Sequence, residues 1–330
     1  MVTETVTFQK VLKWTDEECR TYLEKQRWPS GVCCPRCGVL EPYRITRKSA
    51  TKNTVQTLFK CRACRRQFTS TVGTIFEDSH IPLSKWFAAI YLMCASKKGV
   101  SAHQIHRQLG VTYKSAWFMC HRIREAMKDK GVLTPLSGIV EADETYIHPR
   151  TRRGHPTWHE KVKDEIEMGL RPKPEKKAPY QDNPTVFGML ERDGQVRTMR
   201  VPATTSSVLK PIMGRMIDMQ KARLITDGHP AYRDIKRYLP HDVIDHEVEY
   251  VRGDVHTQGI ENYWSLLKRG IYGVFHHVGE GYLPQYLSEF EFRFNRRKVS
   301  DAERFVALMG QTEGRLTWYC QTPQSQNPHA

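Results

Sequence analysis

Four cysteines in the first quarter of the sequence are spaced as metal ligands. Cys34 and Cys37 form one C-x-x-C knuckle in CPRCG, and Cys61 and Cys64 form a second in CRACRRQF. Each knuckle presents two thiolates to one ion, and two such pairs separated by 23 residues suit a tetrahedral zinc site. The alternatives are a redox pair or four unligated thiols. We predict one structural Zn2+, with a short strand hairpin filling the gap between the knuckles.

A second group of residues suited to chemistry consists of carboxylates that are far apart in the sequence. A strand predicted over 138–147 puts Glu141 and Asp143 on one face, because side chains alternate along a strand. Asp227 ends the apolar run LIT, and Glu261 lies in DVHTQGIENYWSLLKRG, which predicts a helix. Mg2+ prefers oxygen ligands. Two such ions about 4 Å apart can activate a water or hydroxyl and stabilise the leaving oxygen of a phosphodiester.

The elements that would position these carboxylates alternate between strand and helix. After the first strand, the charged and proline-rich stretch 149–184 predicts a long loop or insertion. The order then matches a mixed five-stranded sheet with helices on both sides, as in ribonuclease H, and would bring the carboxylates to one edge. The predicted elements that follow are a hairpin joined at Asp193-Gly194, a helix over 206–220, a strand over 222–227 with a helix after it, a strand over 246–251, and the helix that carries Glu261.

The segment 80–130 has the pattern of a helix-turn-helix. Ser101 and Thr112 are predicted N-caps of two helices, and Gly110 ends the first of them. The first turns of a recognition helix contact base edges, and cationic side chains further along that helix can reach phosphates. The alternative is a plain helical hairpin that packs on its neighbours. The residues of this segment that we predict to contact DNA are Tyr113, Lys114, Ser115 and Arg122.

The composition favours a polyanionic partner. The formal net charge is +15, from 51 Lys plus Arg against 36 Asp plus Glu, which favours nucleic acid first and an acidic membrane second. The longest apolar run begins at Trp86 and has ten residues, about half of what a spanning helix needs. The beginning MVTETVTFQK lacks the basic and then apolar order of a secretory signal. We therefore expect a cytosolic protein with no membrane partner, whose nine cysteines are ligands or core thiols rather than disulfides.

Longer motifs resemble a known family. RRQFTSTVGTIFEDSHIPLSKWF follows the second knuckle, and VEADETYI, ITDGHPAY, HTQGIENYWSLLKRGIYGVFHHV and YLSEFEFRFNRR come after it, over roughly residues 30–300. Together they resemble the bacterial insertion-sequence transposases of the zinc-ribbon DDE class. The resemblance implies a ribonuclease H-like catalytic domain that acts on double-stranded DNA. Such a domain cleaves the ends of the element, which are terminal inverted repeats, and joins the 3′-hydroxyl to target DNA.

The resemblance also assigns roles to residues of this chain. It makes Asp143, Asp227 and Glu261 the catalytic triad, which would hold two Mg2+ or Mn2+ ions. Asp227 and Glu261 are 34 positions apart, which suits the usual short separation of the second and third members. Asp143 is favoured over Glu141 because it precedes the tripeptide ETY, as the family's first aspartate does. The residues near the third member that we predict to contact the DNA backbone are His256, Lys268 and Arg269.

Two other functions fit the same residues. One is a domesticated transposase that binds DNA as a regulator without catalysis, and the other is a nuclease of similar fold that cuts without joining. Because a transposase must bridge two ends, we expect a homo-oligomer on DNA. The predicted parts of the chain are a helical lead (1–29), a zinc ribbon (30–72), the helix-turn-helix-like segment (80–130), the ribonuclease H-like catalytic domain (137–310) and a tail (311–330).

Overall fold

The computed structural model describes residues 6–48, 55–129, 134–147, 168, 184–245, 248 and 251–314. The chain divides into two compact units, one made of Met1–Val132 with Gln285–Ala330 and the other of Leu133–Pro284. Most of the predicted insertion 149–184 and residues 315–330 of the predicted tail lie outside the described residues. Within the described ranges, no helix combines the length and the apolar character that a membrane crossing requires.

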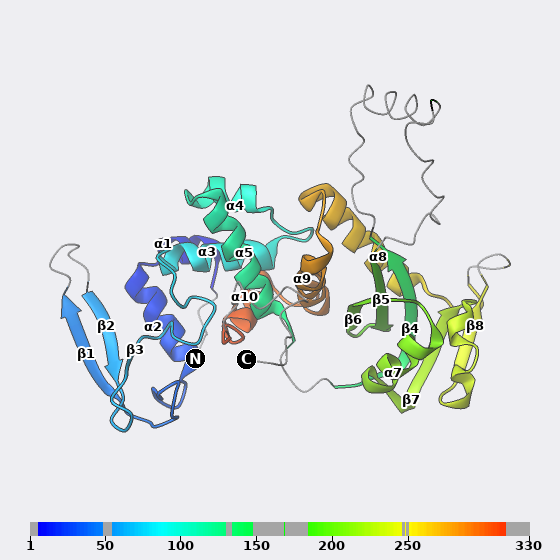
Figure 1. The fold of residues 1–330 in the computed structure, drawn as a ribbon, viewed down its shortest axis with the longest axis horizontal. Helices are drawn as coiled ribbons and strands as arrows, with labels where there is room; N and C mark the ends of the chain where they lie inside the picture. The colour runs from blue at the N-terminus through cyan, green and yellow to red at the C-terminus, as the bar shows by residue number, and fades with distance from the viewer. Residues whose placement is uncertain are drawn as a thin grey trace. The chain divides into compact units, whose positions relative to one another are not determined.

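The first unit is mainly helical. Its largest core gathers buried side chains around Trp86 and Phe87. Thr15 caps the second helix with a capping box, since its hydroxyl accepts the Glu18 backbone N–H and the Glu18 carboxylate accepts the Thr15 N–H. The helices are α1 (Phe8–Lys13), α2 (Asp16–Arg27), α3 (Leu83–Ala95), α4 (Ala102–Leu109), α5 (Tyr113–Met127), α9 (Leu283–Asn295, which begins at the end of the second unit) and α10 (Asp301–Met309) (Figure 1).

The zinc ribbon forms a small antiparallel sheet in the same unit. Strands β1 (Tyr43–Lys48) and β2 (Val55–Lys60) pair as the hairpin predicted between the knuckles, and β3 (Gln67–Phe68) pairs with β2. Trp28, Phe59 and Phe68 are buried beside the cysteines Cys34 and Cys61. These aromatic rings supply a core to a module that is too small to bury much else.

The second unit contains a five-stranded mixed sheet. Its order is β6-β5-β4-β7-β8, with antiparallel pairing among the first three strands and parallel pairing of β4 with β7 and of β7 with β8. This is the ribonuclease H-like sheet that the sequence predicts. The strands are β4 (Leu136–Tyr146), β5 (Thr185–Glu191), β6 (Val196–Val201), β7 (Ile217–Asp227) and β8 (His241–Ile244).

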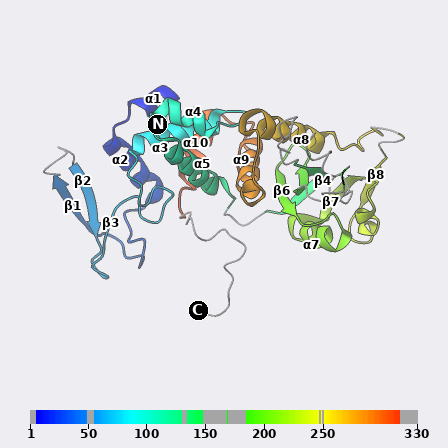
Figure 2. The ribbon, with the colours of Figure 1, turned by 45° about the horizontal axis from the view of Figure 1, so that its top comes forward.

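Helices cover both faces of this sheet. Helix α7 (Ser206–Met216) packs on the face that carries Val140 and Ala142, through a core that includes Leu209 and Met213. Helix α8 (Gln258–Gly270) lies against β4 and β5 on the other side, and Figure 2 shows the two helices on opposite sides of the sheet. A π turn (Ile271–Phe275) continues α8.

Two predicted elements of the second unit are corrected by the structure. The helix predicted over 206–220 ends at Met216, because Ile217 pairs with Leu136 and begins β7. The helix predicted after Asp227 is replaced by two short 3-10 turns, Pro230–Tyr232 and Ile235–Arg237. The fifth strand of the described sheet is β8, and the strand predicted over 246–251 lies mostly outside the described residues. In the first case, pairing with a distant strand overrides local helical spacing.

Candidate active site and zinc site

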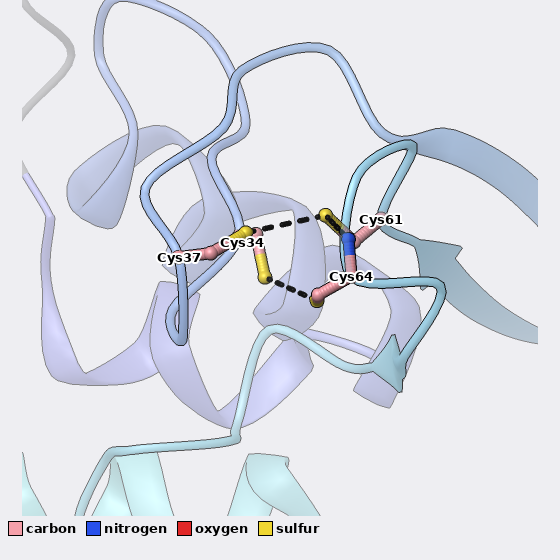
Figure 3. A group of neighbouring side chains, drawn as sticks. All are labelled: Cys34, Cys37, Cys61 and Cys64. Atoms are coloured by element: carbon pink, nitrogen blue, oxygen red, sulfur yellow. Dashed lines mark hydrogen bonds between the residues drawn. The ribbon is translucent and has the colours of Figure 1, made fainter.

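The four predicted cysteine ligands meet at one point. Their sulfur atoms all lie within 4.8 Å of one another, and the side chains point toward each other from the two knuckles (Figure 3). The Sγ atoms of Cys34 and Cys64 are 3.7 Å apart, and those of Cys37 and Cys61 are 3.4 Å apart. Tetrahedral zinc with Zn–S bonds of about 2.3 Å would hold sulfurs about 3.8 Å apart. The donor set therefore fits one structural Zn2+.

The knuckle backbone favours a thiolate at Cys61. The Cys64 backbone N–H donates to Cys61 Sγ at 3.4 Å, and this hydrogen bond is the main reason that the pKa of Cys61 is lowered to about 6. Thiolate is the form that binds zinc. The neighbouring Cys33 stands outside the four-sulfur group, as its spacing predicts.

Asp143 lies near the end of β4 on the face covered by α8. Its Oδ2 accepts a hydrogen bond from Trp264 Nε1 at 2.9 Å, and its Oδ1 accepts the Glu144 backbone N–H at 2.7 Å. The pKa of Asp143 is raised to about 6, chiefly by burial and also by the negative charges of Asp227 and Glu261. Asp227 and Glu261 are therefore each close enough to repel the Asp143 carboxylate.

The fold explains why distant carboxylates approach one another. Ala142 pairs with Thr226 in the parallel register, so Asp143 and Asp227 are the next residues on neighbouring strands. Glu261 lies in the first turn of α8, where its Oε1 accepts a hydrogen bond from the Thr257 hydroxyl at 2.7 Å. Elements that were predicted separately thus bring the three carboxylates to the same end of the sheet.

The two candidate metal sites differ in how tightly the ligands are gathered. Among the described residues, only the four cysteines bring three or more possible ligand atoms within 4.8 Å of one another, so the three carboxylates do not form such a group. Their chemistry nevertheless fits a divalent cation. Three oxygen donors of like charge favour a hard cation between them, since each carboxylate raises the energy of the others.

The neighbouring acid Glu144 faces away from the triad. Its side chain is on the α7 side of β4, where the Tyr232 hydroxyl donates to Oε1 at 2.5 Å. Burial is the main reason that the pKa of Glu144 is raised to about 7. The alternation along β4 therefore separates the two adjacent acids Asp143 and Glu144, as the period of two predicts.

The predicted DNA contacts near Glu261 have different surroundings. Lys268 is half-exposed and Arg269 is exposed on α8, while Ile260, Trp264 and Leu267 are buried. His256 instead lies beside Glu141, with 3.7 Å between its Nδ1 and Glu141 Oε1.

The residues of the helix-turn-helix-like segment that we predicted to contact DNA also differ in exposure. Ser101 and Thr112 cap α4 and α5 as predicted, and Gly110 adopts a left-handed conformation with φ 58°. Tyr113 and Lys114 are exposed and Ser115 is half-buried. Arg122 is only 4% exposed, and its Nη1 donates to the carbonyls of Ile75 at 2.7 Å and Glu77 at 2.6 Å. The Arg122 guanidinium therefore points into the unit. The phosphate contact that we predicted for Arg122 would require it to face solvent.

Sequence reasoning missed several residues that support the triad. No sequence signal connects Trp264 with Asp143, yet the Trp264 indole N–H donates a hydrogen bond to the Asp143 carboxylate. Gly188 leaves room for that ring, because a Cβ there would lie 2.4 Å from Trp264 Cη2. The pairing of Asp143 with Gly188 across β4 and β5 becomes visible only once the strand register is known.

Fold and site together define a ribonuclease H-like domain in a chain that also carries a zinc ribbon. Residues 135–295 match the family described as the ISXO2-like transposase domain, and residues 14–67 match the transposase zinc-ribbon domain. The chain therefore combines an ISXO2-like transposase domain with a transposase zinc-ribbon domain, and it is similar to the insertion-sequence transposases that carry an N-terminal zinc ribbon. One relative is described as an uncharacterized protein in transposable element ISH50 of Halobacterium salinarum. It is 26% identical over 287 residues, which are 84% of this chain and 90% of the relative.

Two solved structures show weak similarity to this chain. One is an intasome of simian T-cell lymphotropic virus in complex with the PP2A regulatory subunit B56 gamma, with TM-score 0.26, 12% identity, and coverage of 58% of this chain and 67% of that one. The other is a pre-cleavage Mos1 transpososome, with TM-score 0.25, 12% identity, and coverage of 66% and 75%. At these TM-scores neither structure carries an inference about this chain.

Proposed function

We propose that this protein is an active DDE transposase. It binds the terminal inverted repeats of its element, cleaves DNA phosphodiesters, and joins the resulting 3′-hydroxyl ends to target DNA. The observation that carries the proposal is that Asp143 and Asp227 lie near the ends of neighbouring parallel strands, with Glu261 close enough to affect the pKa of Asp143. The family match supports the same reaction class.

The carboxylates supply oxygen ligands for two Mg2+ or Mn2+ ions. When bound, the ions would activate the attacking oxygen and stabilise the leaving oxygen of a phosphodiester. The chain orients its own ligands: Trp264 holds one oxygen of Asp143, and Thr257 holds one oxygen of Glu261. On α8, Lys268 and Arg269 follow Glu261 on half-exposed and exposed positions, where they would contact the DNA backbone.

DNA would also be held by the first unit. Tyr113, Lys114 and Ser115 begin α5, the second helix of the helix-turn-helix-like segment, and they would contact bases. The zinc ribbon would add cations, of which Arg44 and Arg62 lie over the rings of Phe59 and Tyr43. Because each reaction involves two element ends, we propose that the protein acts as a homo-oligomer assembled on double-stranded DNA.

A strand-transfer assay tests the function. Purified protein, DNA carrying the element ends and a target plasmid are incubated with Mg2+ or Mn2+, and cleaved and joined products are separated. Replacing Asp143, Asp227 or Glu261 with alanine should reduce cleavage and joining to background, while end binding in a gel-shift assay persists. Asp234→Ala is the matched control, since this carboxylate is 57% exposed and pairs with Lys210 away from the triad.

Each outcome separates the alternatives. Cleavage without joining would identify a nuclease, and end binding without cleavage would identify a non-catalytic regulator. Joining retained in any one of the three alanine variants would remove that carboxylate from the triad.

A further inference from the structure

Glu141 is a buried carboxylate close to the triad, and both of its oxygens accept hydrogen bonds. Only 1% of its side chain is exposed. Its Oε1 accepts two hydrogen bonds from Arg192, at 3.1 Å from Nε and 2.9 Å from Nη2. Its Oε2 accepts the backbone N–H of Ile260 at 2.9 Å. Both oxygens are therefore engaged within the protein, although Glu141 shares a strand face with Asp143.

The Ile260 contact places Glu141 at the beginning of α8. The N-cap residue Thr257 makes no side-chain capping bond, because its hydroxyl is directed to Glu261 instead. Ile260 is the third residue of the helix, whose N–H is normally satisfied by the N-cap side chain. Glu141 provides that acceptor from β4, and its negative charge suits the positive end of the helix dipole.

The backbone of α8 approaches Glu141 as closely as a glycine permits. A Cβ at Gly259 would lie 2.7 Å from Glu141 Oε2 and 2.8 Å from Leu190 Cδ2. Contacts below 3.0 Å require a shift of the surroundings. Gly259 therefore fixes the distance between β4 and the first turn of α8, the turn that carries Glu261.

Arg192 connects Glu141 with the loop that precedes α8. It donates from Nη1 to the Asp254 carbonyl at 2.9 Å and from Nη2 to the His256 carbonyl at 3.2 Å, while binding Glu141. The loop, the helix start and the strand are thus joined through one ion pair, in which the carboxylate is buried and Arg192 is 24% exposed. Removing Arg192 would leave the buried charge of Glu141 without its counterion, which is strongly destabilising locally.

We propose that Glu141 is a positioning residue that sets the location of Glu261 by capping α8, and that it is not a metal ligand. The inference rests on the proposed function for the role of Glu261, although the cap itself is independent of it. Asp143 carries the metal-binding role on this face of β4, while Glu141 fastens the helix that supplies the third carboxylate. Hydrogen-bonded partners of metal ligands typically change metal affinity by about 10- to 100-fold when they are replaced.

Hydrogen exchange and Mn2+ binding test the proposal separately. In Glu141→Gln, amide exchange measured by mass spectrometry should accelerate in peptides covering 257–264, and Mn2+ affinity measured by electron paramagnetic resonance should fall by about 10-fold or more. Gly259→Ala should reproduce both effects with Glu141 and Arg192 intact, because the added methyl group displaces the helix start. Glu280→Gln is the control, since Glu280 is a 55% exposed carboxylate of the same unit that pairs with Arg200.

A double-mutant cycle distinguishes positioning from ligation. If Glu141 acts through Glu261, then Glu141→Gln should not weaken Mn2+ binding further in a Glu261→Ala background. A further loss of about 10-fold in that background would make Glu141 a ligand and overturn the proposal. Unchanged exchange over 257–264 in both Glu141→Gln and Gly259→Ala would also overturn it. A wild-type protein that binds no Mn2+ would refute the proposed function, while the exchange measurement would still decide whether Glu141 anchors the helix.

Discussion

At the residue scale, each carboxylate of the triad is held by a neighbour of a different kind. Trp264 donates an indole N–H to Asp143, and a threonine hydroxyl donates to Glu261. The remaining member, Asp227, accepts the His229 backbone N–H at 3.1 Å. None of these three partners is charged, so these hydrogen bonds orient the carboxylates without neutralising them. Rigid support of this kind keeps ligands in place for a metal ion.

Gly188 gives a direct test of the support around Asp143. In Gly188→Ala, the new methyl group would approach the Trp264 ring to 2.4 Å, so α8 must move away from β5. Overpacking of this kind costs about 1–3 kcal/mol in the free energy of unfolding. We expect a lower denaturation midpoint and slower strand transfer, measured by urea unfolding and by the joining assay. Gly273→Ala is the control, because a Cβ there meets nothing within 4 Å. Unchanged stability and activity in Gly188→Ala would contradict this packing.

At the element scale, the sequence predicts those features whose signals are local. The caps at Ser101 and Thr112, the hairpin joined at Asp193-Gly194, and the helix carrying Glu261 are confirmed by the structure. Each depends on residues within a few positions of one another. The cysteine ligands could also be predicted, because thiolates in paired knuckles have few other uses.

The elements that sequence missed depend on distant partners. Helical spacing continues through Ile217, but that residue pairs with Leu136 and starts a strand. Arg192 lies just after β5 and has no sequence signal that would connect it with Glu141 or with the loop before α8. Such roles arise only when β4, the hairpin and α8 are assembled. The candidate carboxylates could therefore be named from the sequence, whereas the residues that hold them in place could not.

A buried ion pair connects two helices of the first unit. Glu289 of α9 is fully buried and binds Arg124 of α5, with 2.6 Å between Oε2 and Nε, and it also pairs with Arg293. Burial by itself would raise the pKa of Glu289, but the charges of Arg124 and Arg293 outweigh it and lower the pKa. The carboxylate is therefore more easily ionised in the folded state than in the unfolded state.

This pair predicts an acid dependence of stability. Because the folded pKa of Glu289 is lowered, its contribution is present above the unfolded value of about 4.3 and is lost as the pH falls through the folded pKa. Glu289→Gln should lower the free energy of unfolding of the first unit by about 3–5 kcal/mol at neutral pH. Urea unfolding at several pH values should show a smaller acid dependence in the variant. The control is Glu17→Gln, since Glu17 is a 48% exposed partner of Arg20. Equal pH dependence of the wild type and Glu289→Gln would contradict the role of this pair.

At the scale of the whole molecule, the first unit is made from both ends of the chain and the second from its middle. Residues Leu133–Pro284 form the unit with the triad, while Met1–Val132 and Gln285–Ala330 form the unit with the zinc ribbon and the helix-turn-helix-like segment. The net charge of +15 favours binding to DNA, and we propose that both units contact DNA. The two candidate metal sites lie in different units and use different donors, sulfur in one and oxygen in the other.

That separation predicts different responses to loss of zinc. A zinc-selective chelator, in buffer with excess Mg2+, should unfold residues 30–72, because structural zinc supplies about 10–16 kcal/mol to small modules of this kind. Hydrogen exchange should then rise in β1 and β2, end binding should weaken, and β4 and β7 should remain protected. Cys37→Ser should mimic chelation, whereas Cys33→Ser should not, because Cys33 stands outside the four-sulfur group. Calorimetry should show a separate transition for the ribbon. If calorimetry instead shows a single transition for the whole chain, and removal of zinc abolishes that transition, the ribbon is not an independent domain.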